Sequence, residues 1–248
     1  MYSKIIQSIN SAVDACKELW KEPITKIISA RNGELKKIKD AVSMDHCMPN
    51  DILPDAKSII CFFIPFHEAV VNGNINGTLA SEKWAVTYIE TNILIKKINE
   101  NIEDLLEQDG YKAGKIAATH NFDVNKLMSD WSHRHIAYIA GIGTFGINNM
   151  LITKKGCCGR LGSIITNYEF SEYKNLNKRR EKCLNKLNGS CGVCQKKCVA
   201  NAYVNGRFDR FKCYDQCLKN GEYYKKLGTA DVCGKCLVGL PCSTKEPC

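Results

Sequence analysis

The cysteines of this 248-residue chain are concentrated near its carboxyl end, and their spacing limits what that end can fold around. Ten of the fifteen cysteines lie in residues 183–248. Eight of these ten form two runs, each with a Cys-x2-Cys pair: Cys183, Cys191, Cys194 and Cys198, then Cys213, Cys233, Cys236 and Cys242. Thiolates at such spacings hold iron–sulfur clusters, which transfer electrons one at a time. The pattern predicts a redox protein.

The start of the chain bears on the state of these cysteines. Residues 1–20 lack the apolar core and the small-residue cleavage site of a secretory signal, and no apolar run is long enough to cross a bilayer. In a chain that stays in a reducing compartment, clustered cysteines indicate metal binding rather than disulfides. We therefore expect a cytoplasmic, metal-binding protein with no membrane partner.

The two runs can be divided between two 4Fe–4S clusters. In a two-cluster ferredoxin arrangement, one run supplies three ligands of a cluster and the other run supplies the fourth. This arrangement assigns Cys183, Cys191, Cys194 and Cys242 to the first cluster, and Cys198, Cys213, Cys233 and Cys236 to the second. Two features depart from the usual pattern: Val199, not proline, follows Cys198, and the gap before Cys191 is long.

Some cysteines stay open to other interpretations. Cys217, shortly after Cys213, is the rival for the place of Cys213 in the second cluster. Cys157 and Cys158 lie in a glycine-rich loop and are not assigned a role. Four-cysteine zinc sites also use Cys-x2-Cys pairs, so zinc is the alternative metal.

The charge of the chain is uneven. Residues 1–170 carry 19 basic and 19 acidic side chains, whereas residues 171–248 carry 16 basic and 7 acidic ones, so the net charge of +9 resides in the cysteine-rich third. Lysines there would offset the negative charge of thiolate-bound clusters, about −2 for each. The alternative interpretation is a surface that contacts RNA.

Hydrophobic periodicity and turn residues indicate an α+β chain with two domains, residues 1–175 and residues 176–248. The expected elements are a mostly helical region at 1–55, strands at 58–64, 111–119, 150–153 and 164–166, helices at 81–108 and 131–140, and a polar linker at 171–182. Dense glycines between residues 141 and 162 allow the backbone to approach another surface closely.

Several of these segments resemble the epoxyqueuosine reductases. Residues 132–146, which read SHRHIAYIAGIGTFG, are similar to the glycine segment of that family. Residues 148–153, the Gly-Arg-Leu-Gly-Ser string at 159–163 and the entry to the first strand at 53–60 are also similar, and all stand in the family's order ahead of the cysteine runs. The resemblance covers residues 45–245, and the related reductive dehalogenases share its main features.

The resemblance implies a nitroreductase-like α/β sandwich followed by a small ferredoxin-like domain. It implies that two 4Fe–4S clusters pass electrons to a cobalamin, which reduces a substrate, and that Asp130 acts as the catalytic acid. The implied cofactor contacts are Gly141, Gly143, Gly146, Gly159, Arg160 and Ser163.

The implied partners are a low-potential donor such as ferredoxin or flavodoxin, and tRNA. The resemblance does not extend to the C-terminal helical repeats that help to hold tRNA in longer enzymes of the family. Three alternatives remain: an electron-transfer protein serving a partner such as a corrinoid protein, a zinc-stabilised RNA-binding protein, and a flavoprotein with clusters.

Overall fold

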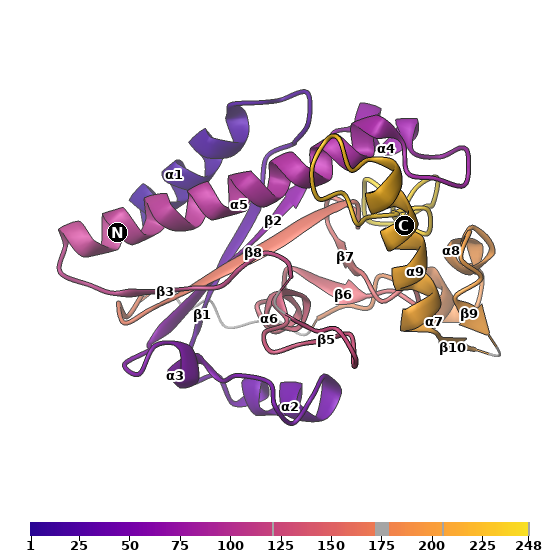
Figure 1. Ribbon diagram of the computed structural model, residues 1–248. Coiled ribbons are helices and arrows are strands. Elements are labelled where there is room, and N and C mark those ends of the chain that lie inside the picture. The colour runs from indigo at the N-terminus through magenta and orange to yellow at the C-terminus, as the bar shows by residue number, and fades with distance from the viewer. Residues whose placement is uncertain (121, 172–178, 205, 248) are drawn as a thin grey trace.

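A four-stranded antiparallel sheet forms the centre of the molecule (Figure 1). The computed structural model describes residues 1–120, 122–171, 179–204 and 206–247. The strand order is β1-β2-β8-β3, with β1 at Ile24–Ser29, β2 at Ser58–Pro65, β8 at Gly159–Thr166 and β3 at Ala113–Lys115. This mixture of helices and antiparallel strands confirms the α+β class expected from the sequence.

Strand β2 is buried along its whole length because both faces of the sheet are covered. Successive side chains of a strand point to opposite faces. Ile60, Phe62 and Ile64 accordingly pack into one core and Ile59 and Phe63 into the other. The first core contains α1 (Tyr2–Asp14) and α5 (Glu82–Gln108). The second is closed by the 3-10 helix Gly33–Lys36, α2 (Lys37–Ala41), α3 (Pro49–Ile52) and α6 (His133–Ile139).

The longest helix, α5, confirms the helix expected at 81–108. Ser81 caps its start, since the Ser81 hydroxyl oxygen accepts a hydrogen bond from the Trp84 backbone N–H (3.3 Å). Side chains at helical spacing, among them Ile95, Ile98 and Ile102, are fully buried against the sheet. The strand predicted at 58–64 is also confirmed, as β2.

Other expected elements need correction. Residues 1–55 are not mostly helical, because Ile24–Ser29 forms the edge strand β1. Ile24, Thr25, Ile27 and Ile28 are β-branched, which favours a strand, and three of them are buried against the sheet and its cover. The strand expected at 111–119 shrinks to β3, and the helix expected at 131–140 is α6, which begins after the capping residue Ser132.

Short elements connect the sheet to the cysteine-rich region. They are α4 (Glu68–Gly73), the paired strands β4 (Phe122–Asp123) and β5 (Met128–Ser129), and the hairpin of β6 (Gly143–Phe145) and β7 (Leu151–Thr153). The cysteine-rich region itself contains α7 (Leu184–Asn188), α8 (Val193–Lys196), the paired β9 (Tyr203–Val204) and β10 (Arg207–Phe208), and α9 (Arg210–Tyr223).

The cysteine-rich region packs against α4 and the start of α5 (Figure 1). The Asn220 side chain accepts a hydrogen bond from the Ala80 N–H (2.8 Å), and the Tyr224 hydroxyl donates to the Ala80 carbonyl (2.7 Å). Leu237 and Val238 are buried in the same core as α5. One hydrophobic core therefore extends from the sheet into the cysteine-rich region.

The last two expectations from the sequence concern the polar linker and the membrane. Most of the linker predicted at 171–182, with the domain boundary at 175/176, lies outside the described residues. Among the described residues, no helix has the length and apolar character needed to cross a membrane.

Candidate iron–sulfur and cofactor site

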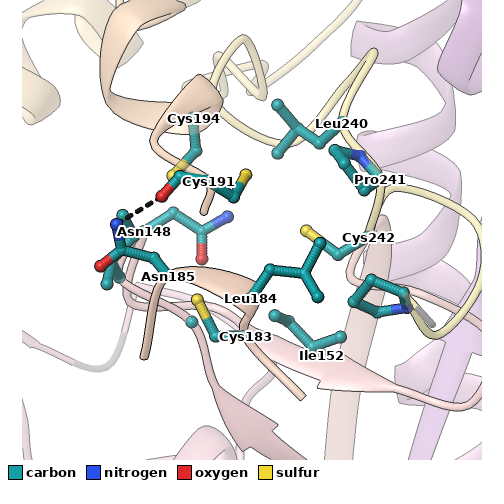
Figure 2. Close-up of a pocket in the computed structure, with 13 residues that line it drawn as sticks. Asn148, Ile152, Cys183, Leu184, Asn185, Cys191, Cys194, Leu240, Pro241 and Cys242 are labelled. Carbon is teal, nitrogen blue, oxygen red and sulfur yellow. Dashed lines mark hydrogen bonds between the residues drawn. The ribbon is translucent and has the colours of Figure 1, made fainter. Parts of the chain in front are cut away.

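Four cysteines line one small cavity in the cysteine-rich region (Figure 2). We call Cys183, Cys191, Cys194 and Cys242 the first cysteine set. Their sulfur atoms face a common space, although they come from the residue that caps α7, the loop after α7, helix α8 and a C-terminal loop. The other residues that line the cavity are largely apolar. They are Gly146, Ile147, Asn148, Ile152, Leu184, Asn185, Leu240, Pro241 and Pro247. The four cysteines assigned to the first cluster thus line one cavity, although among the described residues no three His, Cys, Asp or Glu side chains form a group that could hold a single metal ion.

The thiols of the first set act on one another electrostatically. Burial raises the pKa of Cys194 to about 11, with added contributions from Cys242, Cys183 and Cys191. Hydrogen bonding to Cys157, followed by burial, raises the pKa of Cys242 above its ordinary range. The raised pKa values of Cys194 and Cys242 favour their protonated thiols, and the iron of a cluster would be a cation that stabilises these two thiolates.

The remaining cysteines of the two runs line a second, larger cavity of about 410 Å³. We call Cys198, Cys213, Cys233 and Cys236 the second cysteine set. Burial raises the pKa of Cys233 to about 11. Cys213 and Cys198 raise this pKa further, with Cys213 having the larger effect. Burial also raises the pKa of Cys236, with contributions from the other three members of the set.

Cys217 also lines this cavity, one helical turn from Cys213 on α9. The two thiols share a hydrogen bond, which lowers the pKa of Cys213 and raises that of Cys217. The structure places both candidates beside the second set, so the choice of Cys213 over Cys217 stays a prediction.

Tyr203 lines the larger cavity, and cysteines of both sets affect its hydroxyl. Burial raises the pKa of Tyr203, and Cys236, Cys194, Cys198 and Cys213 contribute in that order. Cys194 belongs to the first set and the other three to the second. The two sets are therefore neighbours.

The Cys233–Cys236 loop is held by the N-terminal part of the chain. Gly234 has a positive φ of 74°, and a Cβ atom there would lie 2.3 Å from the Trp84 ring. The buried Lys235 ammonium donates to the carbonyls of Asn74 (2.9 Å) and Asn76 (2.6 Å). The Asn74 side chain in turn donates to the Cys233 carbonyl (3.0 Å). The glycine and the lysine inside the Cys-x2-Cys pair are thus explained by packing.

The Gly156–Cys158 loop fixes Cys242 in the same way. The Cys157 N–H donates to the Cys242 carbonyl (2.9 Å), and the Cys158 N–H donates to the Ser243 carbonyl (3.0 Å). The Cys158 thiol lies 3.2 Å from the Leu237 carbonyl. Cys157 and Cys158, which the sequence left without a role, therefore contact the segment that carries Cys242.

The larger cavity contains a group of charged and polar side chains. The Tyr88 hydroxyl donates to Asp231 (3.0 Å), and His120 Nε2 lies 3.0 Å from the other oxygen of Asp231. The Arg160 guanidinium stacks over the Tyr88 ring, 4.3 Å from its centroid. Burial raises the pKa of Tyr88 and lowers the pKa of Arg160.

Three residues that line this cavity carry buried polar atoms without a hydrogen-bond partner among the described residues. These atoms are Trp84 Nε1, Arg160 Nε and the Tyr203 hydroxyl. A buried donor without a partner costs about 1–3 kcal/mol. Such atoms are expected where a bound molecule supplies the acceptors.

The residues predicted to contact a cofactor separate into two groups. Gly159 and Arg160 line the larger cavity, and Gly146 lines the cavity of the first cysteine set. Gly141 ends α6 with a φ of 71°, and Gly143 lies where a Cβ atom would be 2.4 Å from the Ile152 carbonyl oxygen of β7. Gly141 and Gly143 line neither cavity, and their structural role is in turns and strand packing.

Ser163, the sixth predicted contact, is buried beneath the cavity rather than lining it. Trp131 Nε1 donates to its hydroxyl (3.0 Å), and the same hydroxyl is 2.8 Å from His133 Nδ1. The other ring nitrogen of His133 is 3.0 Å from the Ala117 carbonyl, to which it donates. Burial lowers the pKa of His133 to about 4, so this histidine is a neutral, satisfied core residue.

The predicted acid Asp130 is exposed and lines neither cavity. Its backbone carbonyl accepts a hydrogen bond from the Cys47 N–H (2.8 Å). The carboxylate that does line the larger cavity is Asp231. Sequence reasoning missed Asp231 and gave Tyr88, which lies in the helix expected at 81–108, no functional role. The only local signal for Asp231 was its position just before Cys233.

Comparison with known proteins gives the fold. No family model matches the chain, and no curated protein matches it in sequence. Among solved structures, an epoxyqueuosine reductase from Bacillus subtilis, solved with its catalytic loop swung out of the active site, aligns with a TM-score of 0.60 and 16% identity over 100% of this chain and 67% of that one. This chain has the fold of the epoxyqueuosine reductases.

Two further epoxyqueuosine reductases agree. The enzyme from Streptococcus thermophilus aligns with a TM-score of 0.56 and 16% identity over 97% of this chain and 66% of that one. A structure bound to an epoxyqueuosine-modified tRNA-Tyr stem loop aligns with a TM-score of 0.60 and 18% identity, covering 98% of this chain and 65% of that one. The chain thus spans about two thirds of the length of the epoxyqueuosine reductases it matches.

Proposed function

We propose that this chain is an iron–sulfur oxidoreductase of the epoxyqueuosine reductase type. In this proposal the two cysteine sets hold two 4Fe–4S clusters, and the larger cavity holds a cobalamin beside a substrate. The domain arrangement is then a nitroreductase-like sandwich in residues 1–175 with a ferredoxin-like module in residues 176–248. The shared fold supports this proposal and gives no support to the electron-carrier or zinc-protein alternatives.

The observation that carries the proposal is the first cysteine set. Four thiols that the sequence assigns to one cluster line one cavity with few other polar groups. A 4Fe–4S cluster takes four thiolate ligands, so the donor set suits it, and such a cluster supplies one-electron chemistry when bound. The backbone at Cys242 is held by the Gly156–Cys158 loop, a contact that involves none of the other three cysteines.

The second cysteine set borders the larger cavity and the first set does not. The thiols of the second set are therefore the ones that face a molecule bound in that cavity. Tyr203 lines the larger cavity together with the second set. In this proposal the second set passes electrons to the molecule bound in that cavity, and the first set supplies the second.

The larger cavity suits a large cofactor with polar groups at its edge. Its walls combine aromatic rings, such as those of Phe122 and Tyr214, with the Arg160 guanidinium and with buried donors that have no partner among the described residues. Cobalamin carries peripheral amides that accept hydrogen bonds from such donors, and when bound it supplies a low-valent metal for reduction. Arg160 and Trp84 are the residues that we expect to bind the cofactor edge.

A reductive ring opening also needs a proton donor. The resemblance assigns this role to Asp130, and the cavity offers Tyr88 with its partner Asp231. We expect a modified nucleoside in tRNA as the first substrate to test, because one structural neighbour holds an epoxyqueuosine-modified stem loop.

Anaerobic purification followed by metal analysis tests the proposal. We expect about eight iron and eight sulfide per chain, a broad brown absorbance and no stoichiometric zinc. Added cobalamin should then bind with a shift of its visible spectrum. A colourless protein with zinc and no sulfide would show the cluster proposal to be wrong, whereas release of a flavin would replace cobalamin alone.

A further inference from the structure

We propose that the Cys157 thiol donates a hydrogen bond to the Cys242 sulfur and thereby raises the reduction potential of the first cluster. This inference rests on the proposed function, because it assigns a further residue to the cluster that the first cysteine set would hold. Cys157 is a positioning residue in this scheme: it acts through Cys242 and does not itself bind iron.

The Cys157 thiol lies in a closed environment beside Cys242. Cys157 and Cys158 are each 1% exposed and belong to the hydrophobic core against which Cys242 packs. The side chains of Cys157 and Cys242 share a hydrogen bond, and the Cys157 N–H donates to the Cys242 carbonyl (2.9 Å). Cys236 of the second set is near enough to act on Cys157 through its charge. The hydrogen bond, however, joins Cys157 to the first set.

The Leu237 carbonyl, which both thiols approach, already has its hydrogen bonds. The Ser243 hydroxyl donates to this carbonyl at 2.6 Å and the Cys158 thiol at 3.2 Å. The Cys157 sulfur is 3.9 Å from the same oxygen. A carbonyl oxygen has two lone pairs, so the two shorter hydrogen bonds fill it. The Cys157 proton is therefore left for the sulfur atoms beside it, those of Cys158 and Cys242.

The charge of a ligating thiolate decides between these two sulfur atoms. When Cys242 binds iron its sulfur has no proton, so its hydrogen bond with Cys157 persists only with Cys157 as the donor. Hydrogen bonds to a charged acceptor are stronger than those to a neutral one, and Cys158 keeps its own proton for the Leu237 carbonyl. Burial in the apolar core also favours the protonated form of the Cys157 thiol.

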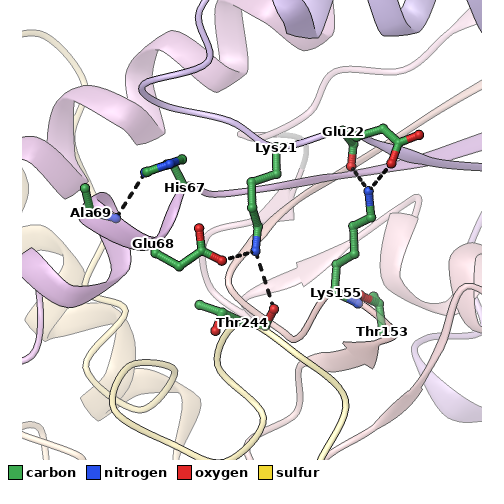
Figure 3. Close-up of polar contacts among 8 residues, drawn as sticks. All are labelled: Lys21, Glu22, His67, Glu68, Ala69, Thr153, Lys155 and Thr244. Atoms are coloured by element: carbon green, nitrogen blue, oxygen red, sulfur yellow. Dashed lines mark hydrogen bonds and ion pairs between the residues drawn. The ribbon is translucent and has the colours of Figure 1, made fainter.

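The two segments that carry these thiols are fixed by neighbouring residues of the N-terminal part of the chain (Figure 3). The Lys21 ammonium donates to the carbonyl of Thr244, two residues after Cys242 (3.4 Å). The Lys155 ammonium, two residues before Cys157, pairs with the Glu22 carboxylate (2.6 Å). The contact between the thiols is thus held in place by the surrounding fold.

A hydrogen bond to a ligand sulfur acts on the potential through charge. Reduction adds one negative charge to the cluster and its thiolates. A donor aimed at a ligand sulfur stabilises this more negative form, and the potential rises. Removal of the Cys157 donor should therefore make the first cluster harder to reduce and leave the second cluster as it was.

Potentiometric titration followed by electron paramagnetic resonance tests the inference on the anaerobically purified chain. We expect Cys157→Ala to lower the potential of one of the two reduction steps by about 59 mV, which is a tenfold change for a one-electron couple. Cys157→Ser keeps a donor and should restore the native potential. Cys158→Ala is the matched control, since it removes a buried thiol that donates to Leu237, and both potentials should stay unchanged.

A second measurement needs no variant. Electron–nuclear double resonance of the reduced native chain should show a proton coupled to the first cluster that exchanges in deuterium oxide, and Cys157→Ala should lack it. Absence of this proton from the native chain would overturn the inference. Equal shifts of potential in Cys157→Ala and Cys158→Ala, or a rise in Cys157→Ala, would do the same. A chain without iron and sulfide would refute the proposed function as well, whereas full clusters with an unchanged potential in Cys157→Ala would refute this inference alone.

Discussion

Replacement of Gly156 by alanine should detach the loop that holds Cys242. Gly156 has a φ of 83°, and an added Cβ atom would lie 2.3 Å from the Ser243 carbonyl oxygen and 2.6 Å from Thr244 Cα. These are backbone atoms, so the Cys242–Thr244 segment must move. The movement breaks the hydrogen bonds from the Cys157 and Cys158 N–H groups to that segment.

The free-energy cost of Gly156→Ala has two parts, and the control variant Gly77→Ala separates them. An L-residue in the left-handed region costs about 1–2 kcal/mol. Two lost backbone hydrogen bonds add about 0.5–1.5 kcal/mol each. Gly77 has nearly the same φ, 78°, with nothing within 4 Å of the added Cβ atom, so Gly77→Ala carries the first part alone. We expect Gly156→Ala to cost about 2–5 kcal/mol and Gly77→Ala about 1–2 kcal/mol.

Thermal unfolding under anaerobic conditions measures this difference, and iron analysis measures its effect on the site. For a chain of this size, each 1 kcal/mol lowers the Tm by about 2–4 °C. Gly156→Ala should also lose roughly half of its iron, since only the first cysteine set depends on Cys242. Equal Tm values for the two variants, or full iron in Gly156→Ala, would refute the idea that this loop holds Cys242 in place.

Three further predictions test the site by substitution. Cys194→Ala should lose one cluster and much of its soluble yield, whereas Cys217→Ala should keep both clusters, as measured by iron and sulfide; equal losses would make Cys217 a ligand. If Asp231 in the larger cavity supports proton donation, Asp231→Asn should lower turnover at least tenfold at unchanged cluster content. If the acid is Asp130, as the resemblance implies, the matched Asp130→Asn should show the larger loss of turnover. In the folded chain the pKa of His133 is about 4, below its unfolded value. The contribution of His133 to stability is therefore present above about pH 6.5 and is lost as the pH falls toward 4. The urea midpoint of His133→Gln should fall less over that pH range than the urea midpoint of the native chain.

The sequence predicted the parts of the structure that depend on local signals. The strand at β2 is a short apolar run closed by a proline, and α5 begins at a capping serine and keeps its buried face over seven turns. The grouping of Cys183, Cys191, Cys194 and Cys242 came from the two-cluster ferredoxin pattern, in which one run supplies three ligands of a cluster and the other run the fourth, and it stays a prediction. The structure places these four residues around one cavity.

The unpredicted parts depend on contacts between distant segments. Strand β1 follows a region of helical composition, and it is a strand because it completes the edge of a sheet beside β2. Tyr88 fits an apolar helix face by periodicity, and only the fold sets its hydroxyl 3.0 Å from Asp231 of the cysteine-rich region. Glycines in a row can serve a ligand or a neighbouring strand, and spacing does not distinguish Gly159 in the cavity wall from Gly143 against β7.

The same long-range contacts argue that cluster binding and folding of the N-terminal sheet are coupled. The Cys233–Cys236 loop rests its glycine on the Trp84 ring and buries its lysine between carbonyls of the segment before α5. Leu237 and Val238 complete the core that α5 forms with the sheet. Without metal, four free thiols would replace the ligated thiolates of each set, and the loop that carries Lys235 would lose its fixed geometry. Loss of a cluster should therefore loosen the packing around Trp84 as well as the cysteine-rich region, and indole fluorescence should report both together.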